Sequence, residues 1–229
     1  MTSPPGPRRR LFDLWSHVYD LGVVQALTYQ PLHDAVAAAL RDMTARRLLD
    51  VGCGTGLLAA RLHREHPDAM VVGCDFSRGM ITHAAQHRGI GCVQGNALAL
   101  PFRNGTFEVV VCTEAFHWFP DQPGALAGFF RVLAPGGLLL LALVSPPHDR
   151  IGDAVHVVSR LLGEPFYWPT AERLRQWLDL AGFDVTWQRP VRRLLGTFLL
   201  PPLLTCARRR PASRSSIRPG ERLPPESLL

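Results

Sequence analysis

The sequence predicts a doubly wound α/β fold, in which helices cover both faces of a mostly parallel, seven-stranded sheet. Short apolar runs, typical of buried strands, alternate along the chain with longer segments of helical periodicity. The apolar run at 46–51 passes directly into a Gly-x-Gly-x-Gly series at 52–56, which is typical of a sharp turn from a strand into a helix. With 229 residues, of which 47% are hydrophobic, the chain is long enough for one sizeable core.

The expected elements follow one another in a regular order, beginning with a helix at 31–42 that has Pro31 in its first turn. Residues 146–170 contain four prolines and interrupt this order, so we interpret them as an insertion. The expected strands lie at 46–51, 69–75, 90–94, 107–112, 138–144, 183–190 and 196–206. The connecting helices are expected at 56–65, 77–88, 122–133 and 170–181.

The loop after the first strand has the features of a nucleotide-type site. Its glycines allow positive φ and a close approach of a ligand, while the following helix directs free N–H groups towards it. The spacing differs from the Gly-x-Gly-x-x-Gly of dinucleotide sites, and a chain without lysine cannot form a P-loop. Asp50 precedes the loop, and an acid there suits a ligand with a positive group and no phosphate. The alternative is a tight turn that binds no ligand.

Asp75 ends the second expected strand, 19 residues after Gly56. One helix and one strand of a right-handed crossover occupy about this length, so Asp75 should lie beside the glycine loop. A carboxylate there can accept both hydrogen bonds of a ribose diol. Alternatively Asp75 caps the next helix, although Ser77 can fill that position and leave Asp75 for the ribose.

Together with two later motifs, the glycine loop resembles the class I S-adenosylmethionine-dependent methyltransferases, within their type 11 small-molecule group. The later motifs are Gly95 to Phe102, similar to G-D-A-x-x-L-P-F, and Arg131 to Gly137, similar to R-V-L-x-P-G-G. In the last motif Pro135 is expected to stop a helix and the glycines to turn the chain into the fifth strand. The resemblance covers roughly residues 11 to 206 and implies a Rossmann-like sheet whose last strand runs antiparallel.

The resemblance also implies S-adenosyl-L-methionine as the cofactor. Asn96 stands where the family has an acid that accepts a hydrogen bond from the adenine amino group, and an amide oxygen can still accept it. Tyr19 lies in a lead-in, 11–30, that folds over the cofactor in relatives; alternatively Phe12, Trp15 and Tyr19 form one apolar helix face. The cofactor-binding residues so implied are Asp50, Gly52, Cys53, Gly54, Gly56, Asp75, Phe76, Met80, Asn96, Ala97, Thr113 and Tyr19.

Methyl transfer from a sulfonium is an in-line displacement, so the protein aligns the nucleophile and supplies a base where one is needed. His117 follows the fourth strand and is our candidate base, because imidazole titrates near neutral pH; alternatively it holds a backbone carbonyl. Trp118 and Phe119 either wall the ligand site or belong to the core. The aromatic run 166–168 suits a flat or apolar acceptor, such as an aromatic or isoprenoid metabolite, or pins the insertion to the body.

Three other functions stay open. A non-catalytic S-adenosylmethionine-binding regulatory or scaffold protein is compatible with Asn96 and with the lack of a clear base. A nicotinamide-dependent oxidoreductase is disfavoured by the glycine spacing. Methylation of RNA or protein rests only on the arginine-rich ends of the chain.

The net charge of +6 belongs to those ends, since residues 1–10 carry +3, 207–229 carry +4 and the domain at 11–206 carries −1. We interpret both ends as disordered, solubilising tails, and nucleic-acid binding is disfavoured because no aromatic residue is interleaved for base stacking. The five cysteines include no C-x-x-C pair and are interpreted as buried thiols, with no metal site. Without a membrane span or a signal peptide, we expect a cytoplasmic monomer or homodimer that acts on a small-molecule methyl acceptor.

Overall fold

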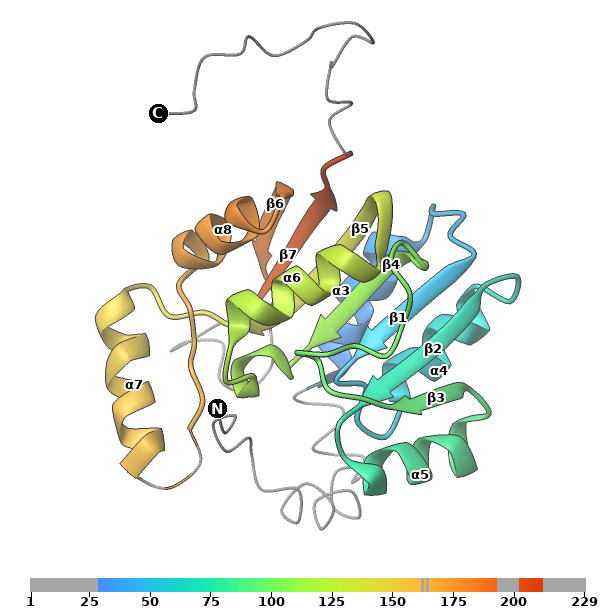
Figure 1. Ribbon diagram of the computed structural model, residues 1–229, viewed down its shortest axis with the longest axis horizontal. Helices are drawn as coiled ribbons and strands as arrows, with labels where there is room; N and C mark the ends of the chain where they lie inside the picture. The colour runs from blue at the N-terminus through green and yellow to red at the C-terminus, as the bar shows by residue number, and fades with distance from the viewer. Residues whose placement is uncertain (1–28, 162, 164, 193–201, 212–229) are drawn as a thin grey trace, which may run out of the picture.

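The computed structural model describes residues 29–161, 163, 165–192 and 202–211, which form a seven-stranded sheet with helices on both faces (Figure 1). The strand order is β3-β2-β1-β4-β5-β7-β6. The first five strands pair in parallel, and β7 pairs antiparallel with both β5 and β6. The predicted doubly wound sheet with an antiparallel last strand is therefore confirmed. The strands are β1 (Arg47–Val51), β2 (Met70–Asp75), β3 (Gly91–Gln94), β4 (Phe107–Thr113), β5 (Leu133–Val144), β6 (Phe183–Pro190) and β7 (Pro202–Arg209).

Two apolar cores lie on opposite faces of the sheet. Along β4, Val110 and Cys112 pack into the core under α6 and α8, while Val109 and Val111 pack into the core under α3 and α4. Burial on both faces explains why the central strands read as continuous apolar runs. The helices are α3 (Gln30–Leu40), α4 (Leu57–Glu65), α5 (Arg78–Arg88), the short 3₁₀ helix η2 (Phe116–Trp118), α6 (Gln122–Val132), α7 (Asp149–Leu161) and α8 (Ala171–Leu180).

Two helix starts are fixed by the side chains that the sequence indicates. Ser77 caps α5 by accepting a hydrogen bond from the amide of Met80, and Thr170 caps α8 by accepting one from the amide of Arg173. Each cap satisfies an amide that has no partner inside its own helix. The cap at Ser77 places α5 directly after the end of β2, beside the glycine loop.

The structure corrects two strand boundaries. β5 begins at Leu133 rather than at 138, because Pro135 to Gly137 form an irregularity within the strand opposite Phe107 to Val109. The predicted turn there is therefore a bulge in the sheet. β7 continues to Arg209, so residues 207–209 belong to the sheet and not to the basic tail. The first part of the predicted strand, 196–201, lies outside the described residues.

The insertion at 146–170 contains α7, a helix that its prolines did not predict. Among the described residues, no helix is long and apolar enough to cross a membrane. All five cysteines are free thiols, but only Cys74, Cys112 and Cys206 are fully buried. The tail at 1–10, the lead-in through residue 28 with Tyr19, and residues 212–229 lie outside the described residues.

Candidate cofactor and acceptor site

The glycine loop joins the carboxyl end of β1 to α4, and all three of its glycines have a positive φ. The φ angles of Gly52, Gly54 and Gly56 are 72°, 54° and 79°. A Cβ on Gly52 would lie 2.2 Å from the Cβ of Ala115, whereas a Cβ on Gly54 would meet nothing within 4 Å. Gly52 is thus required by its conformation and by packing, while the backbone at Gly54 lies open to an approaching group.

Asp75 holds this loop against the end of β2. Its Oδ2 atom accepts a hydrogen bond of 2.9 Å from the amide of Gly54, and its Oδ1 atom accepts one of 2.8 Å from the amide of Ser77. The predicted proximity of Asp75 to the glycine loop is confirmed, and Ser77 fills the cap of α5 as proposed. Asp75 thus joins the glycine loop to the start of α5 through its two carboxylate oxygens.

Asp50 is a buried acid on β1, with only 2% of its surface exposed. Neither carboxylate oxygen has a hydrogen-bond partner of normal geometry. Burial, and then the charge of Asp75, raise the pKa of Asp50 to about 7; the amide of Ala59 acts weakly in the other direction. Asp50 is therefore costly to bury when ionised unless a cation lies beside it.

A narrow cavity of about 30 Å³ opens at Asp50, large enough for a single water-sized group. It joins the glycine loop to the end of β4 and to the first turn of α3. Its lining residues are Tyr29, His33, Asp50, Gly52, Cys53, Gly54, Thr55, Leu57, Leu58 and Thr113.

Five lining residues of this cavity were not among the predicted site residues. Thr55, Leu57 and Leu58 continue the glycine loop into α4, whereas Tyr29 and His33 come from a distant part of the chain. Their spacing of four places both on one face of a helix, which is the only signal that the sequence offers. Burial, and then the charge of Arg61, lower the pKa of His33 to about 4, while Asp34 opposes the shift. His33 is therefore neutral at physiological pH.

The ends of β2 and β3 bring further predicted residues to the same edge. Asp75 pairs with Gln94 across the two strands, and the amide of Gly95 donates to the carbonyl of Asp75. Asn96 follows, and its Oδ1 atom accepts a hydrogen bond of 3.0 Å from the amide of Leu98, which leaves a second lone pair. Phe76 lies half-buried beside them, and Met80 and Ala97 are buried.

The loop after β4 carries an aromatic cluster that reaches the insertion. The ring centroid of Phe166 lies 5.2 Å from that of Trp118 and 6.1 Å from that of His117. The amide of Tyr167 donates to the carbonyl of His117, and Gln122 donates to the carbonyl of Tyr167. The aromatic run at 166–168 therefore pins the insertion to the loop and also packs against the candidate base.

Trp118 and Phe119 of the same loop were each expected either to wall the ligand site or to belong to the core. Phe119 packs against Phe116 and Phe129 at centroid distances of 5.8 and 6.5 Å, so it belongs to the core. Trp118 remains half-buried against Phe166, and His117 is 9% exposed. Phe119 therefore packs against the core and Trp118 against the insertion, and both side chains are half-buried.

Glu114 has a backbone feature that sequence reasoning missed. Its φ of 54° is the only positive φ of a non-glycine residue in the described part of the chain. This conformation costs about 1–2 kcal/mol. The bend lets Ala115 reach Gly52 while the amide of Glu114 donates to the carbonyl of Ala142. No sequence signal marks it, because glutamate is not enriched at such positions.

Comparison with known proteins identifies the family. A family model described as a methyltransferase domain matches residues 49–141. A demethylmenaquinone methyltransferase of Deinococcus radiodurans is 34% identical over 197 residues, which are 75% of this chain and 80% of that protein. The chain belongs to the class I S-adenosylmethionine-dependent methyltransferases. A demethylmenaquinone methyltransferase of Thermus thermophilus is 35% identical to this methyltransferase, over 67% of this chain and 81% of that one.

The fold of the methyltransferase is also that of solved structures. The crystal structure of the [4+2]-cyclase SpnF matches with a TM-score of 0.71 and 19% identity, over 90% of this chain and 98% of that one. The cofactor of the methyltransferase is S-adenosylmethionine, and the chain is an enzyme. Family membership does not favour the alternatives of a non-catalytic binding protein and a nicotinamide-dependent oxidoreductase.

Proposed function

We propose that this methyltransferase methylates a flat, apolar or aromatic ring of the quinone class. The observation that carries the proposal is the packing of Phe166 against His117 and Trp118 at the edge of the sheet where the glycine loop lies. Aromatic walls suit a flat acceptor. The names of the two relatives, demethylmenaquinone methyltransferases, support the same class.

The residues around the glycine loop fit the cofactor, which supplies an activated methyl group when it is bound. Asp50 is buried, and among the described residues neither of its carboxylate oxygens has a hydrogen-bond partner of normal geometry. An ammonium group beside it would offset the cost of its charge. We assign Asp75 to the ribose diol and the open backbone at Gly54 to the carboxylate end of the cofactor, at the start of α4. Asn96 accepts from the adenine amino group in this arrangement.

His117 is the residue that we assign to proton removal from the acceptor. A quinol ring becomes a carbon nucleophile when a ring hydroxyl loses its proton, and a neutral imidazole can take that proton. The insertion packs over the ring of His117 and excludes water from it. Cys53, Gly52, Gly56, Phe76, Met80, Ala97 and Thr113 complete the proposed cofactor contacts.

Calorimetric titration with S-adenosylhomocysteine tests the cofactor assignment. Asp75→Ala should weaken micromolar binding by about 1–3 kcal/mol, because it removes a ribose contact and the bond that holds Gly54. Asp68→Ala is a matched control, since Asp68 is exposed just before the amino end of β2 and should leave the affinity unchanged. Equal affinity in wild type and Asp75→Ala would contradict the assignment.

The acceptor class is tested by turnover. We expect methylation of a reduced demethylnaphthoquinone and none of trans-aconitate, the acceptor in the name of another relative, from Deinococcus radiodurans, that is 33% identical over 143 residues. Turnover of trans-aconitate alone would contradict the quinone class and leave the cofactor assignment standing.

A further inference from the structure

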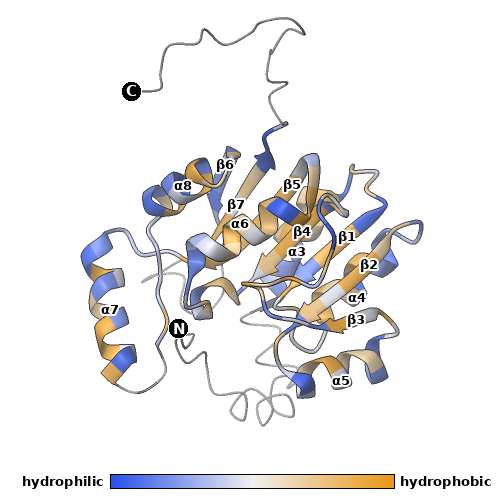
Figure 2. Ribbon diagram, viewed as in Figure 1, coloured by the Kyte–Doolittle hydropathy of each residue, from blue (hydrophilic) through white to orange (hydrophobic). Residues whose placement is uncertain are grey.

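The helix α7 turns its apolar side outward. Ile151, Val157, Val158 and Leu161 are 37%, 57%, 55% and 83% exposed, and they follow helical spacing along one side. Figure 2 shows both hydrophobic and hydrophilic stretches along α7, which stands apart from the sheet. A helix of a folded domain normally places such residues against the core. The outward apolar face, consisting of these four residues, is therefore unexplained by folding.

The side of α7 that faces the body is small and polar. Gly152 and Ser159 are its buried residues, and a Cβ on Gly152 would lie 2.4 Å from the carbonyl oxygen of Trp168. The hydroxyl of Ser159 donates a hydrogen bond to the carbonyl oxygen of Phe166 and accepts one from the amide of Phe166. The Nδ1 atom of His156 lies 2.9 Å from the carbonyl oxygen of Phe166. Hydrogen bonds thus hold α7 to the segment at 166–168 of the same insertion, and the four exposed apolar residues take no part in them.

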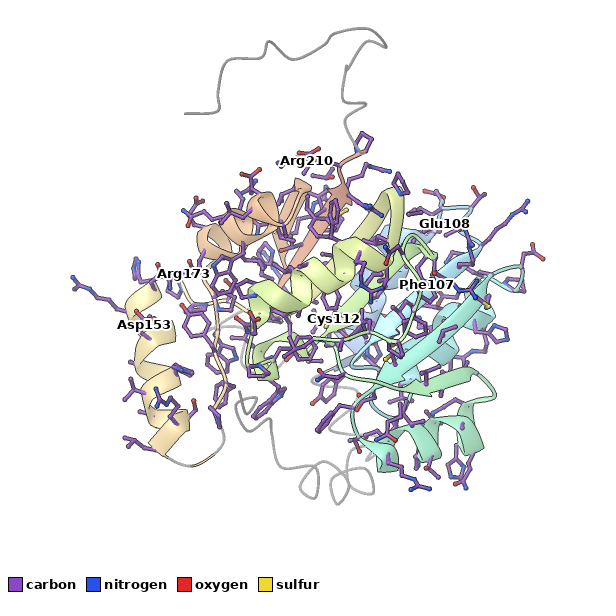
Figure 3. All side chains as sticks on the ribbon, in the orientation of Figure 1. Phe107, Glu108, Cys112, Asp153, Arg173 and Arg210 are labelled. Carbon is purple, nitrogen blue, oxygen red and sulfur yellow. The ribbon has the colours of Figure 1, made fainter. Side chains whose placement is uncertain are left out.

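Some charged residues of α7 contact the rest of the domain and others do not. Asp149 forms an ion pair of 2.8 Å with Arg173 and accepts a hydrogen bond from Thr170, both of which belong to the start of α8. Asp153, labelled on α7 in Figure 3, lies 3.5 Å from the hydroxyl of Tyr167. Arg150 and Arg160 are exposed and form no ion pair within the described part of the chain. Asp153 forms no ion pair there either, so the two unpaired arginines and this one acid leave α7 with a net positive charge.

We propose that α7 docks on a lipid membrane that carries anionic headgroups. The outward apolar face would enter the boundary between headgroups and acyl chains, and Arg150 and Arg160 would contact phosphate groups. The combination of exposed aliphatic side chains with unpaired arginines on one helix favours an anionic lipid surface. This inference goes beyond the proposed function and does not depend on the identity of the acceptor.

The size of the face disfavours a second copy of the chain as its occupant. A helix of 13 residues is about 20 Å long, and one side of it offers only about 200 Å². A stable protein interface needs about 800 Å² from each partner. A membrane has no such requirement, because a single amphipathic helix can lie in its surface.

Sedimentation with vesicles of phosphatidylcholine and phosphatidylglycerol tests the proposal, in the absence of cofactor and acceptor. Wild type should sediment with the vesicles. Val158→Asp/Leu161→Asp should lower the partition coefficient by about tenfold or more, because two aliphatic side chains that would enter the membrane become charged. Leu180→Asp is the matched control: Leu180 is 84% exposed on α8, outside the outward apolar face, and its replacement should leave partitioning unchanged.

The arginines are tested separately. Arg150→Gln/Arg160→Gln should weaken binding to these vesicles by about fivefold or more and leave binding to pure phosphatidylcholine unchanged. Wild type that stays in the supernatant, or a Val158→Asp/Leu161→Asp variant that sediments like wild type, overturns the proposal. A dimer in sedimentation velocity that this variant dissociates would assign the face to a second copy instead. Unchanged titration of S-adenosylhomocysteine in the variant keeps this result separate from the proposed function.

Discussion

Gly52 and Ala115 contact each other where the glycine loop meets the loop after β4. A Cβ on Gly52 would lie 2.2 Å from that of Ala115, so no side chain fits between them. The strained backbone at Glu114 brings Ala115 into this position. The contact joins the loop that we assign to the cofactor to the loop that carries His117, and it fixes the spacing of the two.

Replacement of Gly52 by alanine should therefore destabilise the protein in two separable ways. The positive φ costs about 1–2 kcal/mol, and the collision with Ala115 adds about 2 kcal/mol. Gly89→Ala is the matched control, since Gly89 has a φ of 65° and a Cβ there meets nothing within 4 Å. Urea unfolding measures both variants. Gly52→Ala/Ala115→Gly should recover the steric part, and no recovery would contradict the contact.

The buried acid Asp50 makes stability depend on pH. Its pKa is raised from 3.8 to about 7 in the folded chain. Between these values the folded chain binds a proton that the unfolded chain does not, so the contribution of Asp50 to the free energy of unfolding falls as pH rises. The loss reaches up to about 4 kcal/mol above pH 7. Asp50→Asn should remove this loss of stability, because asparagine does not titrate.

The contribution of His33 to the free energy of unfolding changes with pH in the opposite direction to that of Asp50. Its pKa is lowered to about 4, so the unfolded chain binds the extra proton between pH 4 and 6.5, and its contribution to stability rises with pH over that range. In wild type the contributions of Asp50 and His33 to the pH dependence of stability nearly cancel between pH 4 and 6.5. In urea unfolding at pH 4.5 and 6.5, Asp50→Asn should gain stability with pH and His33→Gln should lose it. Equal slopes in both variants would contradict the two shifts.

The same acid should make cofactor affinity depend on pH. If Asp50 pairs with the ammonium group, binding is strongest when Asp50 is ionised, so affinity for S-adenosylhomocysteine should rise by about tenfold from pH 6 to pH 8. Calorimetry of wild type and Asp50→Asn at both values measures this. Asp50→Asn should bind weakly with no such rise; a rise equal to that of wild type would assign the dependence to another group, such as Asp75.

The sequence predicted the parts of the site that follow strand ends. The length of the crossover placed Asp75 beside the glycine loop, and the hydrogen bond to Gly54 confirms that placement. This succeeded because chain length and handedness leave few alternatives in a parallel sheet. The cofactor roles of the individual residues remain predictions.

The parts that could not be predicted depend on tertiary contacts. The prolines around α7 indicated irregular chain, and a helix whose apolar residues face outward follows the reverse of the usual pattern. A half-buried histidine such as His33 looks like a solvated one until the packing of α3 is known. The bulge at Gly136 was predicted as a turn before the fifth strand, because glycine is common both in turns and in β-bulges.

His117→Gln should lower kcat for the quinol acceptor by about 10²–10⁴-fold, because the acceptor hydroxyl loses its base. Affinity for S-adenosylhomocysteine should not change, since His117 belongs to the loop after β4 and not to the cavity at Asp50. His156→Gln is the matched control: His156 also holds the insertion, through the carbonyl of Phe166, but has no assigned role in proton transfer. A proportional loss in both variants would mean that His117 only holds the insertion in place, and a pH–rate profile whose acid limb disappears in His117→Gln alone would assign it the proton.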